Sequence, residues 1–305
     1  MTAPPVVVFA YARPDTLRRT LECLRENQIP QLYVFCDGAK SDAVTRQVKE
    51  VRALVREITW TKLEIIERGV NFGLGKSIRA GVDEILGKHD SLLVFEDDLI
   101  CVPGTYQYLA AALEQYRDND KVMSVTGWTH RRVTPSDVGE LPYFDGRAES
   151  LLWGTWKRAW KGMDRDAASL VAECRQRGID PTRFGTDVLD MAAAEQKRNI
   201  WAVRWVCLHL LNRGLCMRPP RSMVDHIGLD HRASNAGGDA MWEQTLGPAP
   251  AIPTTWPAAV ENPQCSALWK QIGGGAERGR LRWIAQRLVQ RITARGRELV
   301  VKVRR

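Results

Sequence analysis

The stretch SLLVFEDDLICVPG, residues 91–104, places an apolar run directly before three consecutive acids. Residues 92–95 are typical of a strand buried on both faces in a parallel sheet. Glu96, Asp97 and Asp98 follow at its end. Because open parallel sheets bind ligands beyond the carboxyl ends of their strands, this stretch predicts a buried strand that leads into an acidic binding site.

The same pattern of apolar run, turn and helical segment recurs through the first hundred residues. The runs PVVVFAYA (5–12), QLYVFCDG (31–38) and KLEIIERG (62–69) are separated by polar segments of helical period. Strands that alternate with such helices form right-handed crossovers and a parallel sheet. We therefore expect an α/β protein with a doubly wound, mostly parallel sheet flanked by helices.

The rhythm changes after the acids. We expect a helix over 104–116, a strand over 121–127 and a long loop over 128–150, and we expect helix N-caps at Asp15 and Ser41. Seven of the eleven tryptophans lie between residues 128 and 242. They either line a cleft or fill the core.

Composition indicates a soluble protein. The 305 residues allow a substantial core, no apolar stretch is long enough to span a bilayer, and no charged-then-apolar leader opens the chain. The seven cysteines form no CxxC pair and leave one over, which argues against a zinc ribbon or a disulfide framework. We expect a reducing, cytoplasmic location.

The net charge of +8 is concentrated at the C-terminus. Residues 278–305 hold ten Arg or Lys and one Glu, a net +9, so the rest of the chain carries −1. Apolar residues at helical spacing from Leu281, with Trp283 near their boundary, predict an amphipathic cationic helix. Such a tail is suited to an anionic membrane surface; it could also bind nucleic acid, which we consider the weaker alternative, or dock on its own domain.

Adjacent carboxylates repel each other, so Asp97 and Asp98 favour a cation. Mg²⁺ or Mn²⁺ would keep coordination positions open for nucleotide phosphates. The alternative is a solvated acidic turn, but the preceding strand weighs against it.

The segment ERGVNFGLGKS, residues 67–77, resembles a phosphate loop only superficially. The Walker pattern needs Gly at position 70, which is Val, and the dinucleotide fingerprint needs Gly at position 78, which is Ile. A flexible turn remains, followed by Lys76 and Arg79 at a helix start, where a diphosphate could rest. The alternative for this pair is an exposed helix face.

The ordered set FAYARP, CDG, ERGVNFGLGKSIRAG and VFEDDL resembles the nucleotide-sugar half of the GT-A glycosyltransferases. It is most similar to the bacterial family 2 and hemolysin-type enzymes and to the Golgi N-acetylglucosaminyltransferase with a Glu-Asp-Asp-Leu motif. LLWGTWKRAW (151–160) and the Trp-x-x-x-Trp segment within 199–230 extend the resemblance over about 230 residues. It implies the Rossmann-like GT-A fold.

Carried over residue by residue, the resemblance implies the donor contacts. Ala12 and Arg13 would border the nucleobase and ribose, and Asp37 would accept a hydrogen bond from a pyrimidine NH. Glu67 and Arg68 would lie near the nucleoside.

It also implies the diphosphate and metal contacts. Lys76 would lie near the diphosphate, Asp97 near the ribose or metal, and Asp98 would be the direct ligand of Mn²⁺ or Mg²⁺. Relatives place a late His ligand where this chain has Asn235, so His231 or His226 would have to supply the imidazole.

The chain departs from its relatives at the expected catalytic base. The carboxylate that follows the first Trp of Trp-x-x-x-Trp is replaced by Ala202, which cannot take a proton. Three alternatives stay open: a base from Asp187, Asp190 or Glu195, a retaining reaction, or binding without turnover.

The sequence therefore predicts a GT-A domain over 1–265, with a nucleotide-sugar half at 1–127 and an acceptor half at 128–265, and a basic amphipathic tail over 266–305. We expect a metal-dependent hexosyl- or N-acetylhexosaminyltransferase that uses a nucleoside-diphosphate sugar. Its acceptor would be a glycan or lipid-linked hydroxyl in cell-envelope polysaccharide or glycolipid synthesis, at the inner face of the plasma membrane.

A sugar-nucleotide pyrophosphorylase would need a Gly-rich loop that AYARPDTLRR, residues 10–19, lacks. The alternative is a nucleotide-sugar or carbohydrate-binding protein that derives from a transferase.

Overall fold

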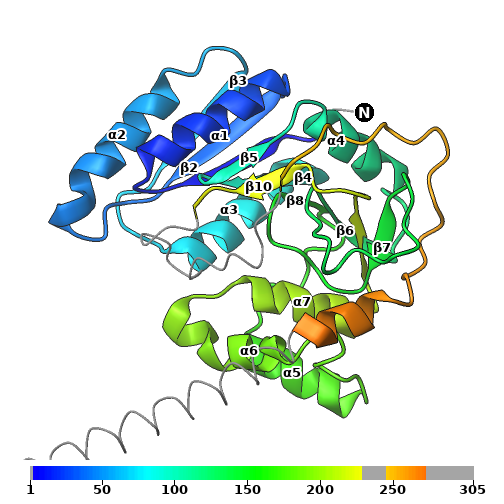
Figure 1. Cartoon of the computed structure of the whole chain (residues 1–305). Coiled ribbons are helices and arrows are strands. Elements are labelled where there is room, and N and C mark those ends of the chain that lie inside the picture. Colours follow the sequence, from blue (N-terminus) through cyan, green and yellow to red (C-terminus); the bar gives the residue numbers. More distant parts are fainter. Residues whose placement is uncertain (1–2, 229–244, 273–305) are drawn as a thin grey trace, which may run out of the picture.

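The computed structural model describes residues 3–228 and 245–272. Its centre is an eight-stranded sheet in the order β3-β2-β1-β4-β8-β6-β9-β7 (Figure 1). The first half comprises β1 (Val6–Ala10), β2 (Gln31–Cys36), β3 (Lys62–Glu67) and β4 (Ser91–Glu96), which run parallel. The doubly wound, mostly parallel α/β fold expected from the sequence is confirmed.

The burial of the first strands follows their composition. All five residues of β1 are buried, as a continuous apolar strand in a covered parallel sheet should be. β3 lies at the edge, and its charged residues Lys62, Glu64 and Glu67 are exposed. Charged side chains on an edge strand hinder pairing with another chain.

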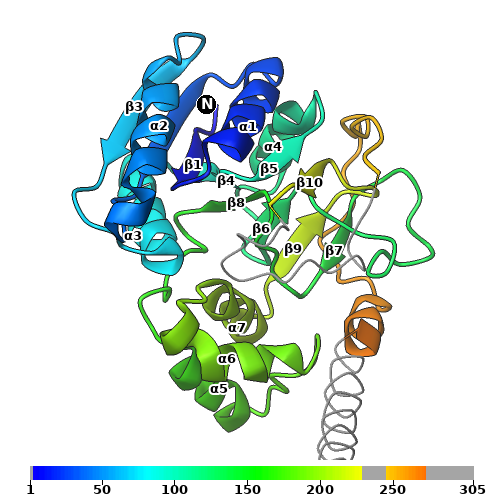
Figure 2. The same cartoon turned by 60° about the vertical axis from the view of Figure 1, so that its left-hand side comes forward.

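Helices cover both faces of the sheet (Figures 1 and 2). On one face lie α1 (Pro14–Glu26), α2 (Thr45–Arg56), which follows the short helix η1 (Asp42–Val44), and α4 (Thr105–Gln115). The other carries α3 (Leu74–Lys88), α5 (Ala167–Gln176), α6 (Asp187–Arg198) and α7 (Ala202–Asn212). No helix in the described ranges is long and apolar enough to cross a bilayer.

The second half of the sheet departs from the predicted elements. The strand expected over 121–127 is β6 (Val122–Thr126), but the region predicted as a loop over 128–150 contains β7 (Tyr143–Asp145). The Trp-rich segment forms β8 (Trp153–Trp156), which lies antiparallel between β4 and β6. β9 (Leu215–Arg218) pairs parallel with β6 and antiparallel with β7. Antiparallel strands thus enter a sheet whose first half is parallel.

A short second sheet lies beside the acids. β5 (Leu99–Cys101) follows Asp98 directly and pairs antiparallel with β10 (Val224–His226). This pairing brings a segment more than 120 residues downstream to the end of β4. The predicted N-cap at Asp15 is wrong, because α1 begins at Pro14 and Asp15 lies in its first turn. Ser41 precedes η1 without a side-chain cap hydrogen bond.

Candidate functional site

The carboxyl ends of β1, β2, β3 and β4 meet at one edge of the sheet, because the four strands are parallel neighbours. This edge gathers Arg13, Asp37, Arg68 and Asp98, which come from four separate loops. It is the edge at which open α/β sheets bind their ligands.

Asp98 is the most connected of the three acids. Its Oδ2 atom accepts a hydrogen bond from Arg13 Nη1 at 2.8 Å and lies 3.1 Å from His226 Nε2. Its Oδ1 atom is buried and has no hydrogen-bond partner within the described residues. One carboxylate oxygen is therefore held by the protein while the other remains available to a ligand.

The backbone of Gly228 packs directly against Arg13 and Asp98. Arg13 Nη2 donates to the Gly228 carbonyl at 3.0 Å. A Cβ atom at Gly228 would lie 2.0 Å from Asp98 Oδ2 and 2.6 Å from Arg13 Nη1. Only glycine allows the backbone to pass this close to the Arg13–Asp98 pair.

Asp97 and Glu96 are the other two acids at this edge. Asp97 Oδ2 accepts a hydrogen bond from the Tyr11 backbone N–H at 2.8 Å, which ties the end of β4 to the end of β1. Burial, followed by the negative charge of Asp98, raises the pKa of Asp97 to about 7. Burial and the neighbouring aspartates also raise the pKa of Glu96 well above its ordinary value.

The loop between β3 and α3 is fastened by Asp37. Its carboxylate accepts backbone N–H bonds from Gly38, Phe72 and Gly73, at distances from 2.9 to 3.1 Å. These bonds fix the start of α3 beside the end of β2. Lys76 then lies exposed on the first turn of α3, where a positive side chain and a helix N-terminus both favour an anion.

Arg68 and Lys76 share one aromatic platform. Arg68 Cζ lies 4.2 Å from the ring centroid of Phe72, and Lys76 Nζ lies 4.4 Å from the same centroid. Arg68 Nε and Nη2 are buried and have no hydrogen-bond partner within the described residues. The loop thus presents two cations in a fixed arrangement.

Glu67 contacts arginines of α2 and not the cations beside Phe72. Its carboxylate forms ion pairs with Arg56 at 2.5 Å and Arg52 at 3.4 Å, both on α2. Arg52 also donates to the Arg68 carbonyl at 2.6 Å. Within the structure Glu67 therefore anchors the end of β3 to α2.

The three candidate bases all lie on α6. Asp187 is paired with Arg147 at 2.5 Å, and Glu195 is buried, paired with Arg204 and bonded to the Ala167 N–H at 2.8 Å. Asp190 is exposed on the same helix. The helix therefore supplies three carboxylates, and those of Asp187 and Glu195 hold arginines.

Ala202, which replaces the carboxylate expected of relatives, is the first residue of α7. The tryptophans around it fill the core and do not line a cleft. Trp153 stacks on Trp160 with ring centroids 5.3 Å apart and meets Trp201 and Trp205 at 5.2 and 5.9 Å. All four are at most 5% exposed, so the core interpretation of these residues is confirmed.

Asn199 contacts the start of α3, which could not be predicted from the sequence. It ends α6 in a left-handed conformation and packs against the start of α3. A Cβ atom at Gly73 would lie 2.7 Å from Asn199 Nδ2, and one at Gly75 would lie 2.4 Å from its carbonyl oxygen. The only available signal was the GLG sequence at 73–75, which indicates a close backbone approach without naming the partner.

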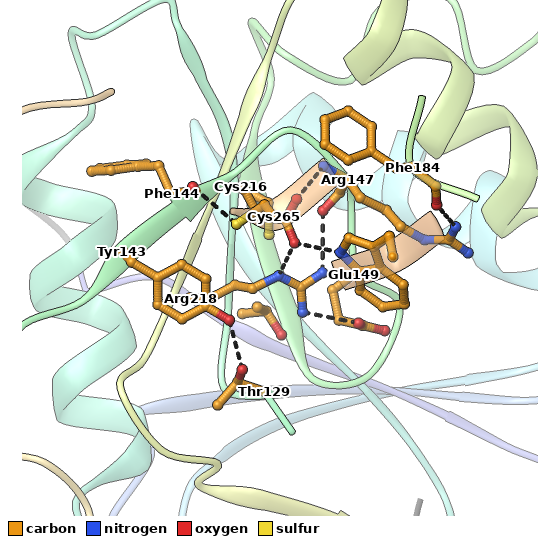
Figure 3. A network of polar contacts seen from close by, with 12 residues as sticks. Thr129, Tyr143, Phe144, Arg147, Glu149, Phe184, Cys216, Arg218 and Cys265 are labelled. Carbon is orange, nitrogen blue, oxygen red and sulfur yellow. Dashed lines mark hydrogen bonds and ion pairs between the residues drawn. The ribbon is translucent and has the colours of Figure 1, made fainter. Parts of the chain in front are cut away.

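A buried ionic network supports the second half of the sheet (Figure 3). Arg218 is fully buried and forms ion pairs with Asp145 at 3.0 Å and Glu149 at 3.1 Å. Burial alone would lower the pKa of Arg218, but the two carboxylates outweigh it and raise the pKa. Trp269 Nε1 donates to Asp145 Oδ2 at 2.7 Å, which joins the helical segment 265–272 to the network.

The arrangement around Asp98 fits a divalent ion in part. The unpartnered Oδ1 atom is the kind of hard oxygen ligand that Mg²⁺ and Mn²⁺ take. The described residues contain no group of three or more His, Cys, Asp or Glu side chains that could hold a metal alone. Most of the coordination shell would have to come from phosphate oxygens and water.

His231 and the basic tail over 278–305 lie outside the described residues.

Similar structures are distant. The mannosyltransferase PcManGT of Pyrobaculum calidifontis, solved with GDP-Man and Mn²⁺, shares 14% identity over 57% of this chain and 47% of its own, with a TM-score of 0.35. A cytidylyltransferase of Leptospira borgpetersenii shares 11% identity over 54% of this chain and 64% of its own, with a TM-score of 0.33. HddC of Yersinia pseudotuberculosis shares 15% identity over 51% of this chain and 77% of its own, with a TM-score of 0.31.

The chain thus spans about half the length of the mannosyltransferase. No protein with a curated description matches the sequence significantly. The family described as Glycosyl transferase family 2 matches residues 6–145, which run from the start of β1 to the end of β7 and include Arg13, Asp37 and Asp98. Residues 6–145 of the chain are therefore similar to glycosyl transferase family 2.

Proposed function

We propose that the protein transfers a sugar from a nucleoside-diphosphate sugar to a hydroxyl acceptor. The observation that carries the proposal is the end of β4, where Asp98 presents a buried, unpartnered oxygen beside Arg13 and His226. A nucleotide diphosphate together with a divalent ion would bind both the unpartnered carboxylate oxygen and the Arg13 guanidinium. The family 2 match, which includes Arg13 and Asp98, supports this proposal.

Asp98 would hold the metal, which supplies positive charge against the departing diphosphate when it is bound. Arg13 is held by Asp98 and by the Gly228 carbonyl, so it would stand fixed at the same edge. Lys76 would meet the diphosphate from the start of α3. Such preorganised cations stabilise the charge that develops in the reaction.

The nucleoside would lie between the ends of β1, β2 and β3. Ala12 and Arg13 would border it from the first loop, and Asp37 from the second. Asp37 already fixes three backbone N–H groups, so a bond to a base would be added to an oriented carboxylate. Arg68 would contribute its unpartnered nitrogens, and Asp97 would lie toward the ribose or metal.

The acceptor hydroxyl needs a base unless the reaction is retaining. We propose that it comes from α6, with Asp187, Asp190 and Glu195 as the candidates. Asp187 is paired with Arg147 and Glu195 with Arg204. Each carboxylate would have to release its arginine before it could accept a proton from the acceptor hydroxyl. We propose a hexosyl- or N-acetylhexosaminyltransferase acting on a glycan or lipid-linked acceptor at the cytoplasmic face of the plasma membrane.

A donor-binding protein without turnover is the second candidate. Ala202 favours it, since this first position of α7 cannot accept a proton. The two candidates share the donor site and differ only in the chemical step.

Calorimetric titration of nucleoside diphosphates with Mn²⁺, followed by assays of donor hydrolysis and sugar transfer, separates the candidates. The transferase predicts metal-dependent binding and measurable sugar release, both abolished in Asp98→Asn. Asp118→Asn is the matched control, because Asp118 is exposed and paired only with Arg117 at 3.1 Å in the described contacts. Binding without any turnover would favour the second candidate, and full activity in Asp98→Asn would refute the site.

A further inference from the structure

A pocket of about 580 Å³ opens on the sheet where the loops after β6 and β9 meet. The described residues that line it include Thr129, His130, Arg131, Thr134, Arg221 and Ser222. Its size lies within the range of small-molecule sites. None of these groups belongs to the donor site proposed above.

The pocket lies at the same edge of the sheet as Asp98. Trp153 of β8 is paired with both Val94 of β4 and Thr126 of β6, so Val94 is level with the last residue of β6, and β4 runs two residues further in the same direction. One strand separates them, which places the two ends roughly 10 Å apart. A molecule bound in the pocket could therefore extend a reacting group toward the donor.

The chain also connects the two places directly. Met223 N–H donates to the Gly127 carbonyl at 2.8 Å, which fixes this segment against the end of β6. Ser222, in the pocket, is four positions before His226, which lies 3.1 Å from Asp98. Extended backbone of that length spans roughly 13 Å.

The polar lining is basic. Among the described residues that line the pocket, Arg131, Arg221 and His130 have nitrogen donors, and none is acidic. Arg131 is exposed and forms no ion pair within the described ranges. Arg221 pairs with Glu140 at 2.6 Å, but the Glu140 side chain is 81% exposed, so a stronger anion could replace it at little cost.

Hydrogen bonds fix the loop after β6, which lines one side of the pocket. Thr129 Oγ1 shares a hydrogen bond with Tyr143 at 2.7 Å and another with Thr134 at 2.8 Å. Figure 3 shows Thr129 and Tyr143 beside the buried Arg218. Arg218 Nη1 also donates to the Trp128 carbonyl at 3.4 Å. The loop after β6 is thus anchored to the ionic network.

His130 is oriented within this loop. The Arg132 backbone N–H donates to His130 Nδ1 at 3.2 Å, so a neutral His130 carries its proton on Nε2. The ring is 1% exposed and stacks on Trp128 with an interplanar angle of 13°. The lining therefore offers two guanidinium groups beside a buried imidazole of fixed orientation.

Guanidinium and imidazole N–H donors are the groups that recognise phosphate most strongly. We propose that this pocket binds a phosphate group carried by the acceptor, an inference that rests on the proposed sugar transfer. The phosphate can come from a lipid phosphate or from a soluble sugar phosphate, since the recognising chemistry is the same. Arg131 and Arg221 are its principal contacts.

Calorimetric titration of the full chain tests the proposal. The donor site is first saturated with a nucleoside diphosphate and Mg²⁺, and inorganic phosphate, glucose 1-phosphate and farnesyl phosphate are then titrated separately. We expect binding of the phosphate esters with the donor site filled, weakened tenfold or more in the Arg131→Gln/Arg221→Gln double variant. Tighter binding of farnesyl phosphate would indicate a lipid source, and tighter binding of glucose 1-phosphate a soluble one.

Arg46→Gln is the matched control, because Arg46 is also a surface arginine paired with a glutamate, at 2.8 Å on α2. It should leave every phosphate affinity unchanged. Equal affinities in the wild type and the double variant would overturn the proposal, as would phosphate binding that disappears once nucleotide fills the donor site. Phosphate binding without any nucleotide binding would instead contradict the proposed transferase and leave the pocket assignment standing.

Discussion

At the scale of single residues, the site depends on the different surroundings of the two carboxylate oxygens of Asp98. Arg13 and His226 take Oδ2, and Gly228 leaves them room to do so. Oδ1 is buried without a partner in the described residues. A buried carboxylate oxygen without a hydrogen bond costs free energy, which an incoming cation would recover.

Buried His209 makes the stability of the fold sensitive to acid. Its ring lies between Ser124 Oγ and the Trp205 carbonyl, both at 2.9 Å, and burial lowers its pKa to about 3. In the unfolded chain a histidine takes up a proton as the pH falls through about 6.5. Between these values the unfolded state binds more protons, so stability decreases as the pH falls.

We predict that the free energy of unfolding of the wild type falls by about 2 kcal/mol more than that of His209→Gln between pH 7 and pH 5. Urea unfolding of both proteins at the two pH values measures this difference. An equal loss in the two proteins would contradict the assignment, whatever the stability of the variant at pH 7.

The sequence located some of these residues and not others. Asp98 could be predicted because a buried apolar strand ends two residues before it. Arg13 follows β1, which pairs with β4. The contact with His226 could not be predicted, because it depends on the pairing of β5 with β10. His231 and His226 were both possible as the late imidazole on sequence grounds, and strand pairing places His226 at Asp98.

At the scale of elements, the parallel half of the sheet was predictable because each strand and helix has its own periodic signal. The antiparallel half was not. β8 has only four residues, Trp-Gly-Thr-Trp, too few to show an alternation. A Cβ atom at Gly154 would lie 2.6 Å from Leu93 and 3.1 Å from Val125, so the strand fits only between β4 and β6. Such a tertiary fit has no local sequence signature.

The ionic network joins β7, β9 and residues 265–272, so breaking it should loosen all three. We predict that Arg218→Met lowers the free energy of unfolding by about 3–5 kcal/mol, because Asp145 would remain buried and charged without its cation. Thermal and urea unfolding measure the loss. Arg46→Met, which removes an exposed helical pair, should cost less than about 0.5 kcal/mol.

Adding Asp145→Leu to Arg218→Met should recover part of the stability, since it removes the uncompensated charge. A loss in the single variant no larger than that of Arg46→Met would show that the network does not support these elements.

At the scale of the whole molecule, both predicted halves share one sheet. The nucleotide-sugar half contributes β1 to β4 and β6 to this sheet, and the acceptor half contributes β7, β8 and β9. The division at residues 127 and 128 stays a prediction about function, as does the boundary of the tail at 265 and 266. Charge separates the chain more sharply, since the last 28 residues carry a net +9 and the rest of the chain carries −1.

We predict that deleting residues 278–305 strongly weakens binding to anionic vesicles, because each basic residue near such a surface contributes about 1 kcal/mol. Sedimentation with vesicles of phosphatidylglycerol and phosphatidylcholine measures the effect. Nucleotide binding by the truncated protein is the control and should be unchanged. Unchanged vesicle binding after truncation would remove the membrane role of the tail.

The central claim is that Asp98 holds a divalent ion against the diphosphate of a sugar donor. Crystals grown with a nucleoside diphosphate and Mn²⁺ test it most directly, because anomalous scattering locates the manganese. The account predicts a manganese peak about 2.0–2.6 Å from Asp98 Oδ1, bridged to the diphosphate and beside Arg13. Nucleotide bound elsewhere on the molecule, with no manganese at the end of β4, would contradict it.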